Sequence, residues 1–397
     1  MKLSVPLLAA AAFAMLTNEF NIIGIIPLIA QDLNVPVPTV GLLVTAFAFT
    51  VAITGPFLTL ALRRVERRRL FTGVLSVTAA GAVVAATAPN YAVLALGRIA
   101  SALALPVFWS MATSTAARVA DPDTAGRAIA TVFAGVSIAS VIGSPITTIL
   151  ADAFGWRMAF AAGAAVCAGM AVLMWKFFPR LEAPAEDITP VPFRALIHPM
   201  IVSHLAMSFL ALTAMFTSYT YLADVLTRVG HFTSASTGWI LMGFGVAGIV
   251  GNEIAGRFVD VNPLRAAVGA VAIAGLAMAA FPYVLDAHIA AMAVLAIWGA
   301  AHAAGFVTNH VRTVRAAPLA LQDLTASLNV SIFNAGIGMG AVVGGNVVGA
   351  LSLPEIGVAG ALIGVLALGV ASVIAIGERS TRGIPERAGA GLSCQQC

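Results

Sequence analysis

Apolar runs follow one another along the whole chain and are separated by short polar segments. A run of about 18 or more apolar residues predicts a membrane-spanning helix, because roughly 20 helical residues cross the hydrocarbon core of a bilayer. The sequence predicts twelve spans, at residues 5–30, 39–62, 70–88, 91–118, 124–151, 157–178, 200–223, 236–259, 264–284, 287–316, 322–350 and 355–377. The first run is too long for the apolar region of a signal peptide, so we expect it to be retained.

A polar, proline-rich stretch at residues 179–199 divides the predicted spans into six plus six. Such composition between apolar runs is typical of a linker. We therefore expect an all-α membrane protein made of two pseudo-symmetric six-helix bundles, at residues 1–178 and 200–377. The linker and the tail at residues 378–397 are expected to lie in the cytoplasm.

The two predicted halves resemble each other in sequence. The segment AGVSIASVIGSP (134–145) of the fifth span matches AGIGMGAVVGGN (335–346) of the eleventh, so that Gly135 pairs with Gly336 and Gly143 with Gly344. Two six-span repeats favour a transporter, in which the substrate site lies at the interface of the repeats.

Small residues recur every four positions in the eleventh span, at Gly336, Gly340 and Gly344. Such a stripe allows helix backbones to pack closely in lipid, and it is also a candidate sliding surface between two rocking halves. In the fifth span, Pro145 lacks a backbone donor and is expected to kink the helix.

Charge is scarce and unevenly placed. The chain is 60% hydrophobic and 10% charged, with a net charge of +4. Of its 21 Lys and Arg residues, all but Arg98, Arg157 and Arg228 fall on segments that share one side if the N-terminus is cytoplasmic. This bias predicts that both termini are cytoplasmic. The positive charge is explained by orientation in the membrane, and no nucleic-acid partner is expected.

The sequence offers little for soluble chemistry. It has no Walker loop, no nucleophile elbow and no His, Asp or Glu cluster at metal-ligand spacing. We expect no enzyme activity, no cofactor and no metal. Cys167 is expected to be inert packing, while the terminal Cys394 and Cys397 form a C-x-x-C pair that is either a reduced tail or a metal or redox pair.

Two charged residues fall inside predicted spans. A carboxylate such as Glu19 costs about 2.5–3.5 kcal/mol at the bilayer centre on insertion scales. Helix rise places Glu19 near the midplane and Arg98 about 10 Å below the start of the fourth span, so the two side chains are expected at neighbouring depths. A buried carboxylate beside an arginine stays ionised, and one without such a partner binds a proton. The pair is therefore either a proton-coupling device or a permanent ion pair that fixes helix packing.

The tenth span carries His302 and Asn309 on one helical face, with His310 turned away from it. An intramembrane histidine can relay protons or bind a polar substrate, or it can be a neutral side chain satisfied by a neighbouring helix. Glu253 lies four residues before Arg257 near the end of the eighth span, which indicates an ordinary stabilising pair. Glu253 nevertheless remains a candidate for coupling.

Four stretches together resemble the Major Facilitator Superfamily, within its twelve-span drug:proton antiporter group and nearest to the bacterial arabinose/sugar and purine efflux branch. They are TNEFNIIGIIPLIAQDL (17–33), LGRIASALALPVFW (96–109), Gly135 with Gly143, Pro145 and Gly155-Trp156-Arg157, and WGAAHAAGFVTNHVRTVRAAP (298–318) with ASLNVSIFNAGIGMGAVVGG (326–345). The resemblance covers residues 5–377.

The resemblance implies a central pathway between spans 1, 4, 7 and 10. It implies proton coupling through Glu19 and Arg98. Because His302 lies inside the tenth span, it is a third candidate for proton coupling. The side chains expected to line the substrate cavity are Asn18, Trp109, Tyr219, Tyr221 and Asn309. It also implies a bacterial inner membrane location.

The loop after the second span departs from the family pattern. It retains Arg64, Arg67 and Arg68 but has Arg63 where the family has an aspartate that helps to latch one conformation. These arginines are expected to contact anionic lipid instead. The second-half copy keeps Gly256, Arg257 and Asp260.

The residues and the resemblance together predict a proton-coupled exporter of a small organic solute such as a sugar, purine or drug. Its expected partners are that solute, protons and the bilayer, and it is expected to be a monomer. A proton symporter or facilitator for uptake remains an alternative, as does a membrane sensor or scaffold without transport.

Overall fold

The computed structural model describes residues 3–120, 125–182, 198–318 and 321–382. Twelve helical segments there are long and apolar enough to cross a membrane, as the sequence predicts. The first six are formed by α1 (Ser4–Phe20) with η1 (Ile23–Ile25) and α2 (Ile26–Asp32), by α3 (Val37–Leu62), α4 (Arg67–Ala86) and α5 (Tyr91–Val119), by α6 (Ala125–Ile138) with the π-helical turn η3 (Ala139–Gly143) and α7 (Ser144–Phe154), and by α8 (Trp156–Phe177).

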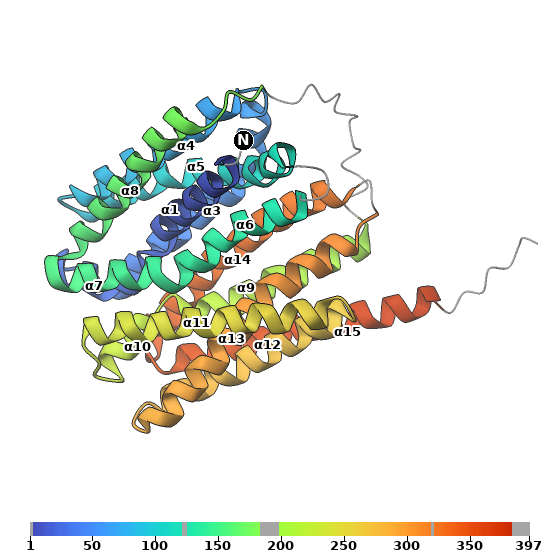
Figure 1. Ribbon diagram of the computed structural model, residues 1–397. Helices are drawn as coiled ribbons and strands as arrows, with labels where there is room; N and C mark the ends of the chain where they lie inside the picture. Colours follow the sequence, from blue (N-terminus) through green and yellow to red (C-terminus); the bar gives the residue numbers. More distant parts are fainter. Residues whose placement is uncertain (1–2, 121–124, 183–197, 319–320, 383–397) are drawn as a thin grey trace, which may run out of the picture.

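The second six spans repeat this order. They are formed by α9 (Pro199–Tyr219) with α10 (Leu222–Arg228), by α11 (Ser234–Val259), by α12 (Pro263–Ala280) with η5 (Phe281–Tyr283), and by α13 (His288–Arg315), α14 (Gln322–Ala350) and α15 (Glu355–Arg382). Figure 1 shows the two bundles one above the other, the first in blue to green and the second in yellow-green to red.

The two bundles pack in the same pattern. In the first, α3 and α4 pack on α5, and α4 packs on α8; in the second, α11 and α12 pack on α13, and α12 packs on α15. The first span packs on the fifth, and the seventh packs on the eleventh in the same way. This equivalence confirms the predicted pseudo-symmetric fold.

Short links connect the spans, and polar residues in several of them cap the helix that follows. Asn90 caps α5 by accepting a 3.0 Å hydrogen bond from the Val93 backbone N–H, and Asn262 caps α12 in the same manner. The link between α7 and α8 is Gly155 alone, whose φ of 85° is a conformation that glycine adopts without steric cost. The links before α5 and α8, which separate the third span from the fourth and the fifth from the sixth, are therefore real but very short.

The first spans of both bundles are interrupted, which the sequence analysis did not predict. Between α1 and α2, Pro27 lacks the N–H that would bond the carbonyl of Ile23, which weakens the helix at this point. The seventh span breaks at Thr220 and Tyr221. In the fifth span the expected distortion at Pro145 is present as the π-helical turn that precedes it.

The glycine stripes pack inside the bundles and not between them. A Cβ at Gly135 or Gly143 would meet α1, at Ala9 and Thr17. A Cβ at Gly336, Gly340 or Gly344 would meet the backbone of α9. The prediction of a sliding surface at Gly336, Gly340 and Gly344 is therefore wrong in this arrangement, because the contact they make lies within one bundle.

Other glycines lie between the bundles. Gly238 and Gly245 of α11 approach the fifth span, and Gly338 of α14 approaches α3, where the Thr45 hydroxyl donates to the Gly338 carbonyl at 3.0 Å. At one end of the molecule, which we call the α10 end, α10 packs on α2 and η1, and α7 packs on α11. The opposite end, which carries the arginine-rich loop at residues 63–69, is called the basic end.

The α14–α9 contact gives a test of the close packing. Gly340→Val places methyl groups against the Thr213 carbonyl and Phe216, and overpacking of this kind costs about 1–3 kcal/mol. We expect a lower melting temperature in detergent. Gly349→Val, on the same helix but facing open space, is the matched control. Equal melting temperatures for the two variants would contradict the packing.

Candidate functional site

Arg98 closes the broken end of α1. Its guanidinium is buried and donates to the Asn18 carbonyl at 2.7 Å and to the Glu19 carbonyl at 2.8 Å. These carbonyls belong to the last turn of α1, where no continuing helix supplies donors. The C-terminal end of a helix also carries partial negative charge, which favours a cation there. Arg98 therefore supports the interruption in the first span.

This geometry corrects the expected ion pair. Arg98 contacts the main chain of Glu19, and the salt bridges found in the described part of the chain include neither residue. The Glu19 side chain is 8% exposed and lies within electrostatic reach of Arg98. The carboxyl group is thus near the positive charge without being held by it.

The surroundings of Arg98 are partly apolar and partly polar. The guanidinium carbon lies 4.4 Å from the centre of the Phe47 ring, and one nitrogen is 3.5 Å from Asn21 Oδ1. Buried Asn21 Nδ2 and Asn18 Oδ1 have no hydrogen-bond partner in the residues that the structure describes. Unsatisfied buried groups in such a cluster indicate a site that can rearrange or take up water.

Asn18 does not line the space between the bundles. Its Oδ1 lies against Gly163 of α8, inside the first bundle. The prediction that Asn18 faces the substrate cavity is therefore wrong for this conformation, because the rotation of α1 turns it away from the second bundle.

The second bundle encloses an arginine that the sequence analysis did not select. Arg312 of α13 is 2% exposed, and its guanidinium approaches His204 Nδ1 at 2.6 Å and donates to the His204 carbonyl at 2.9 Å. It also donates to Ser208 and Asn309. The sequence analysis placed Arg312 on a cytoplasmic segment because it lies near the end of an apolar run. His204, a polar residue in the facing run, was the one sign in the sequence that could have indicated a buried contact.

An aromatic cluster surrounds His302 on the inner side of the second bundle. The His302 ring centre lies 4.8 Å from that of Tyr219, 5.5 Å from Phe216, 5.6 Å from Phe244 and 5.6 Å from Phe306. We call these five residues the His302 cluster. His302 Nδ1 is buried and has no hydrogen-bond partner within the described ranges. The cluster therefore combines ring faces with one free polar atom.

The His302 cluster reaches the other bundle. Phe20, the last residue of α1, stacks on Phe216 with ring centres 6.2 Å apart. Phe20 and Phe216 each lie just before the break in their span. The cluster is therefore placed where the bundles meet, midway along the molecule.

Two further cavity predictions fail. Tyr221 is fully buried, and its hydroxyl donates to the Ala341 carbonyl at 2.9 Å against α14. Asn309 donates to the Gly305 carbonyl at 2.8 Å on its own helix and is fully buried. Both side chains are fully buried, whereas Tyr219 is half-buried in the His302 cluster. Trp109 is half-buried and stacks on Phe133 of the fifth span at 5.9 Å.

The loop motifs at the basic end differ between the bundles. Arg67 is 3% exposed and donates to the Arg63 carbonyl at 3.2 Å, and Arg68 lies 4.6 Å from the centre of the Trp175 ring. Arg67 therefore does not lie on lipid as expected. Of this trio, Arg64 is exposed.

In the second bundle, Asp260 pairs with Arg315 at 2.6 Å, joining the end of α11 to α13. Arg257 pairs with Glu253 at 3.1 Å with both side chains exposed, as expected of a structural pair. A Cβ at Gly256 would meet nothing within 4 Å, so packing does not require glycine there.

The fold defines a class of protein. Two six-helix bundles related by a repeat, each with an interrupted first span and buried polar groups, form the architecture of a secondary transporter. The chain belongs to the Major Facilitator Superfamily, whose sequence profile matches residues 8–341.

Relatives extend over nearly the whole chain. It is 33% identical over 371 residues to the inner membrane transport protein YdhP of Escherichia coli strain K12, covering 93% of this chain and 95% of that one. It is 30% identical over 365 residues to a probable sugar efflux transporter of Mannheimia succiniciproducens, covering 92% and 91%.

Solved structures share the fold. The nucleoside transporter NupG superposes with a TM-score of 0.77 at 12% identity, covering 94% of this chain and 99% of that one. A bacterial homologue of the lysosomal transporter Spinster, in an inward-facing and unoccupied conformation, gives 0.77 at 15% identity, covering 97% and 98%. Family and fold are thus those of multi-pass membrane transporters.

Proposed function

We propose that the protein exports a small organic solute with a planar or ring-shaped apolar face, such as a sugar or a heterocycle, in exchange for protons. The observation that carries the proposal is the arrangement at the break in the first span. There a buried carboxyl group, Glu19, lies beside an arginine whose hydrogen bonds are directed to the main chain.

This arrangement suits proton coupling. Because Arg98 is committed to the carbonyls of Asn18 and Glu19, the Glu19 carboxyl group can gain or lose a proton without an ion pair having to form or break. The charge of Arg98 still favours the ionised carboxylate, and burial favours the neutral acid. A movement of α1 against α5 would change that balance, which links helix movement to proton binding.

The His302 cluster supports the proposed substrate class. The half-buried rings of Tyr219 and Phe306 offer stacking area, and the free Nδ1 of His302 offers one hydrogen bond. Ligand sites in proteins are commonly apolar with a few placed polar groups. Relatives that bear the name of sugar efflux transporter agree with this class.

We propose that the basic end faces the cytoplasm, since a concentration of arginine marks the cytoplasmic side. A cysteine introduced at Asn90, in the link before α5, should then react with a membrane-impermeant maleimide added outside intact cells, whereas a cysteine at Glu186 should not. The reverse pattern would invert the orientation, and labelling of both would contradict the twelve-span topology.

Transport in sealed vesicles tests the function. The purified protein is reconstituted with an imposed pH gradient or without one, and the flux of radiolabelled sugars and purines is followed. We expect accumulation against a gradient only when the proton gradient is imposed. Flux that equilibrates without coupling would indicate a facilitator, coupled flux in the direction of the protons would indicate a symporter, and no flux for any solute that binds would favour a sensor.

A further inference from the structure

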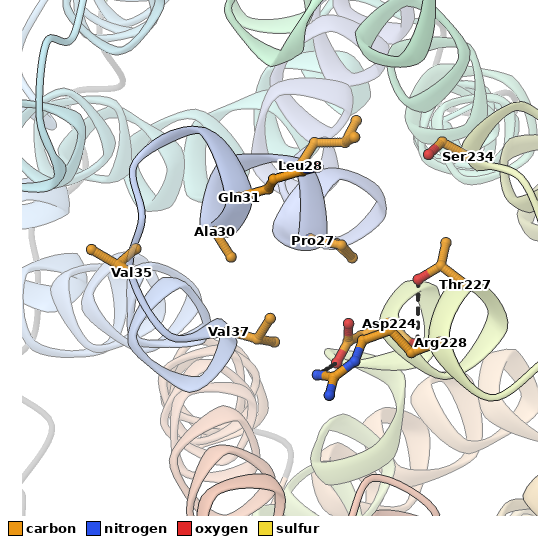
Figure 2. A pocket seen from close by; sticks show the side chains of 10 residues that line it. All are labelled: Pro27, Leu28, Ala30, Gln31, Val35, Val37, Asp224, Thr227, Arg228 and Ser234. Atoms are coloured by element: carbon orange, nitrogen blue, oxygen red, sulfur yellow. Dashed lines mark hydrogen bonds and ion pairs between the residues drawn. The ribbon is translucent and has the colours of Figure 1, made fainter. Parts of the chain in front are cut away.

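A cavity lies between the bundles at the α10 end, away from the His302 cluster. Its volume is about 450 Å³, within the range of roughly 300–1,000 Å³ found for small-molecule sites. Figure 2 shows that one wall comes from α2 and the segment that follows it, and the opposite wall from α10 and the start of α11. Both bundles therefore contribute to it.

Asp224 is the unusual residue of this cavity. Its side chain is 0% exposed, and Oδ2 accepts a hydrogen bond from Arg228 at 3.3 Å. Oδ1 has no hydrogen-bond partner among the residues described. In Figure 2 one carboxylate oxygen faces Arg228 and the other is directed into the space beneath Pro27. A buried acceptor left unpaired costs about 1–3 kcal/mol, which a donor from a ligand would offset.

The charge balance of the cavity restricts the ligand. Asp224 and Arg228 pair with each other, so the polar wall carries no net charge and would attract neither a cation nor an anion strongly. Gln31 and Ser234 add groups that can both donate and accept hydrogen bonds, and the Thr227 hydroxyl, which donates to the Ala223 carbonyl at 2.9 Å, can accept one. The ligand that matches this set is neutral and carries several hydroxyl groups.

Apart from Gln31, the α2 wall is apolar. Pro27 and Val37 face Asp224 and Arg228 across the cavity, and Leu28, Ala30 and Val35 also line it. A sugar ring presents C–H groups on one face and hydroxyl groups at its edge, so it satisfies both walls at once. Gln31 is exposed and the Arg228 side chain is 61% exposed, so the cavity can be reached from the surface of the α10 end.

We propose that this cavity binds a neutral polyhydroxylated solute of monosaccharide size, with a hydroxyl donating to Asp224 Oδ1 and another accepting from Arg228. The site is separate from the His302 cluster and does not depend on proton coupling or on the direction of transport. Because its walls belong to different bundles, a bound solute holds α2 and α10 together and stabilises the closed α10 end.

Labelling of a cysteine at Ser234 tests the site. Full-length Ser234→Cys protein in intact cells is treated with a membrane-impermeant maleimide, with or without arabinose, glucose, mannitol or sorbitol. A solute at twice its Kd should slow labelling about threefold, because only the empty site reacts. Ala287→Cys, in the exposed link before α13 at the same end, is the control and should react at the same rate with and without solute.

Two further changes separate binding from folding. Asp224→Asn keeps the shape of the side chain but removes its charge, and Gln31→Ala removes an exposed amide from the other bundle. We expect each to reduce the protection of Ser234→Cys at least twofold. If Asp224→Asn protein does not reach the membrane, the protection measured in the Gln31→Ala variant alone tests the site.

The outcomes are distinct from those of the proposed function. Unchanged labelling of Ser234→Cys with every solute, or equal protection of Ala287→Cys, overturns the site even if the protein exports sugars. Protection that survives both Gln31→Ala and Asp224→Asn also overturns it. Protection in a protein without proton-coupled flux leaves the site standing and refutes the transport mechanism.

Discussion

Arg98→Ala is expected to abolish transport and to lower the melting temperature of the purified protein. The change removes the donors to the Asn18 and Glu19 carbonyls, and hydrogen bonds to a charged group contribute about 1.5–3 kcal/mol each. In a bilayer no water replaces them easily. The end of α1 then loses its support, and Glu19 loses the nearby positive charge. Vesicle flux and thermal unfolding in detergent measure the two effects.

Arg118→Ala is the matched control, because Arg118 lies on the same helix and, among the described residues, its side chain donates only to the exposed Glu182 carbonyl, at 3.4 Å. It should transport normally. Arg98→Lys keeps the charge but presents one ammonium group where the fork of the guanidinium spans two carbonyls, so we expect it to be more stable than Arg98→Ala and to transport weakly. Normal export by Arg98→Ala would remove this residue from the mechanism.

Glu19→Gln is expected to fold and yet to lose accumulation against a gradient. The substitution keeps the shape of the side chain and removes a buried charge, so the protein should be at least as stable as the parent. It mimics the protonated carboxyl group permanently, so passive exchange of solute is expected to remain. Proton release on addition of substrate to detergent-solubilised protein is the decisive measurement, and it should be absent in the variant.

Glu253→Gln serves as the comparison for this second experiment. Glu253 is exposed and paired with Arg257, so its replacement should leave proton release unchanged. If Glu19→Gln releases protons as the parent does, the coupling group lies elsewhere. Loss of release in Glu253→Gln would then identify Glu253, and His302→Gln would be compared next.

The sequence predicted the twelve spans because hydropathy is a property of whole helices. It could not predict the direction of single side chains. Asn18 and Asn309 occur in apolar runs that are buried on several faces, so no periodicity reveals which face meets the other bundle. The interruption at Asn21 was concealed because the residues between it and Pro27 are isoleucine and glycine, which continue the apolar run.

Contacts between distant segments were equally hidden. The glycine stripes were recognised, but their partners in α1 and α9 depend on the order in which helices pack. The burial of Arg312 was not foreseen because Arg312 lies within a turn of the end of its helix, where loop and buried arginines look alike in the sequence. The Asp224 cavity requires α2 and α10, about 190 residues apart in the sequence, to meet.

The breaks in the first and seventh spans divide each of these helices into a long inner part and an outer part of seven residues, about 10 Å in length. Phe20 and Phe216 stack on the inner side of both breaks, while the Asp224 cavity lies on the outer side. The outer segments are therefore two short helices, each of which begins close to the stacked rings. The stacked rings and the outer segments thus form two successive layers along the line where the bundles meet.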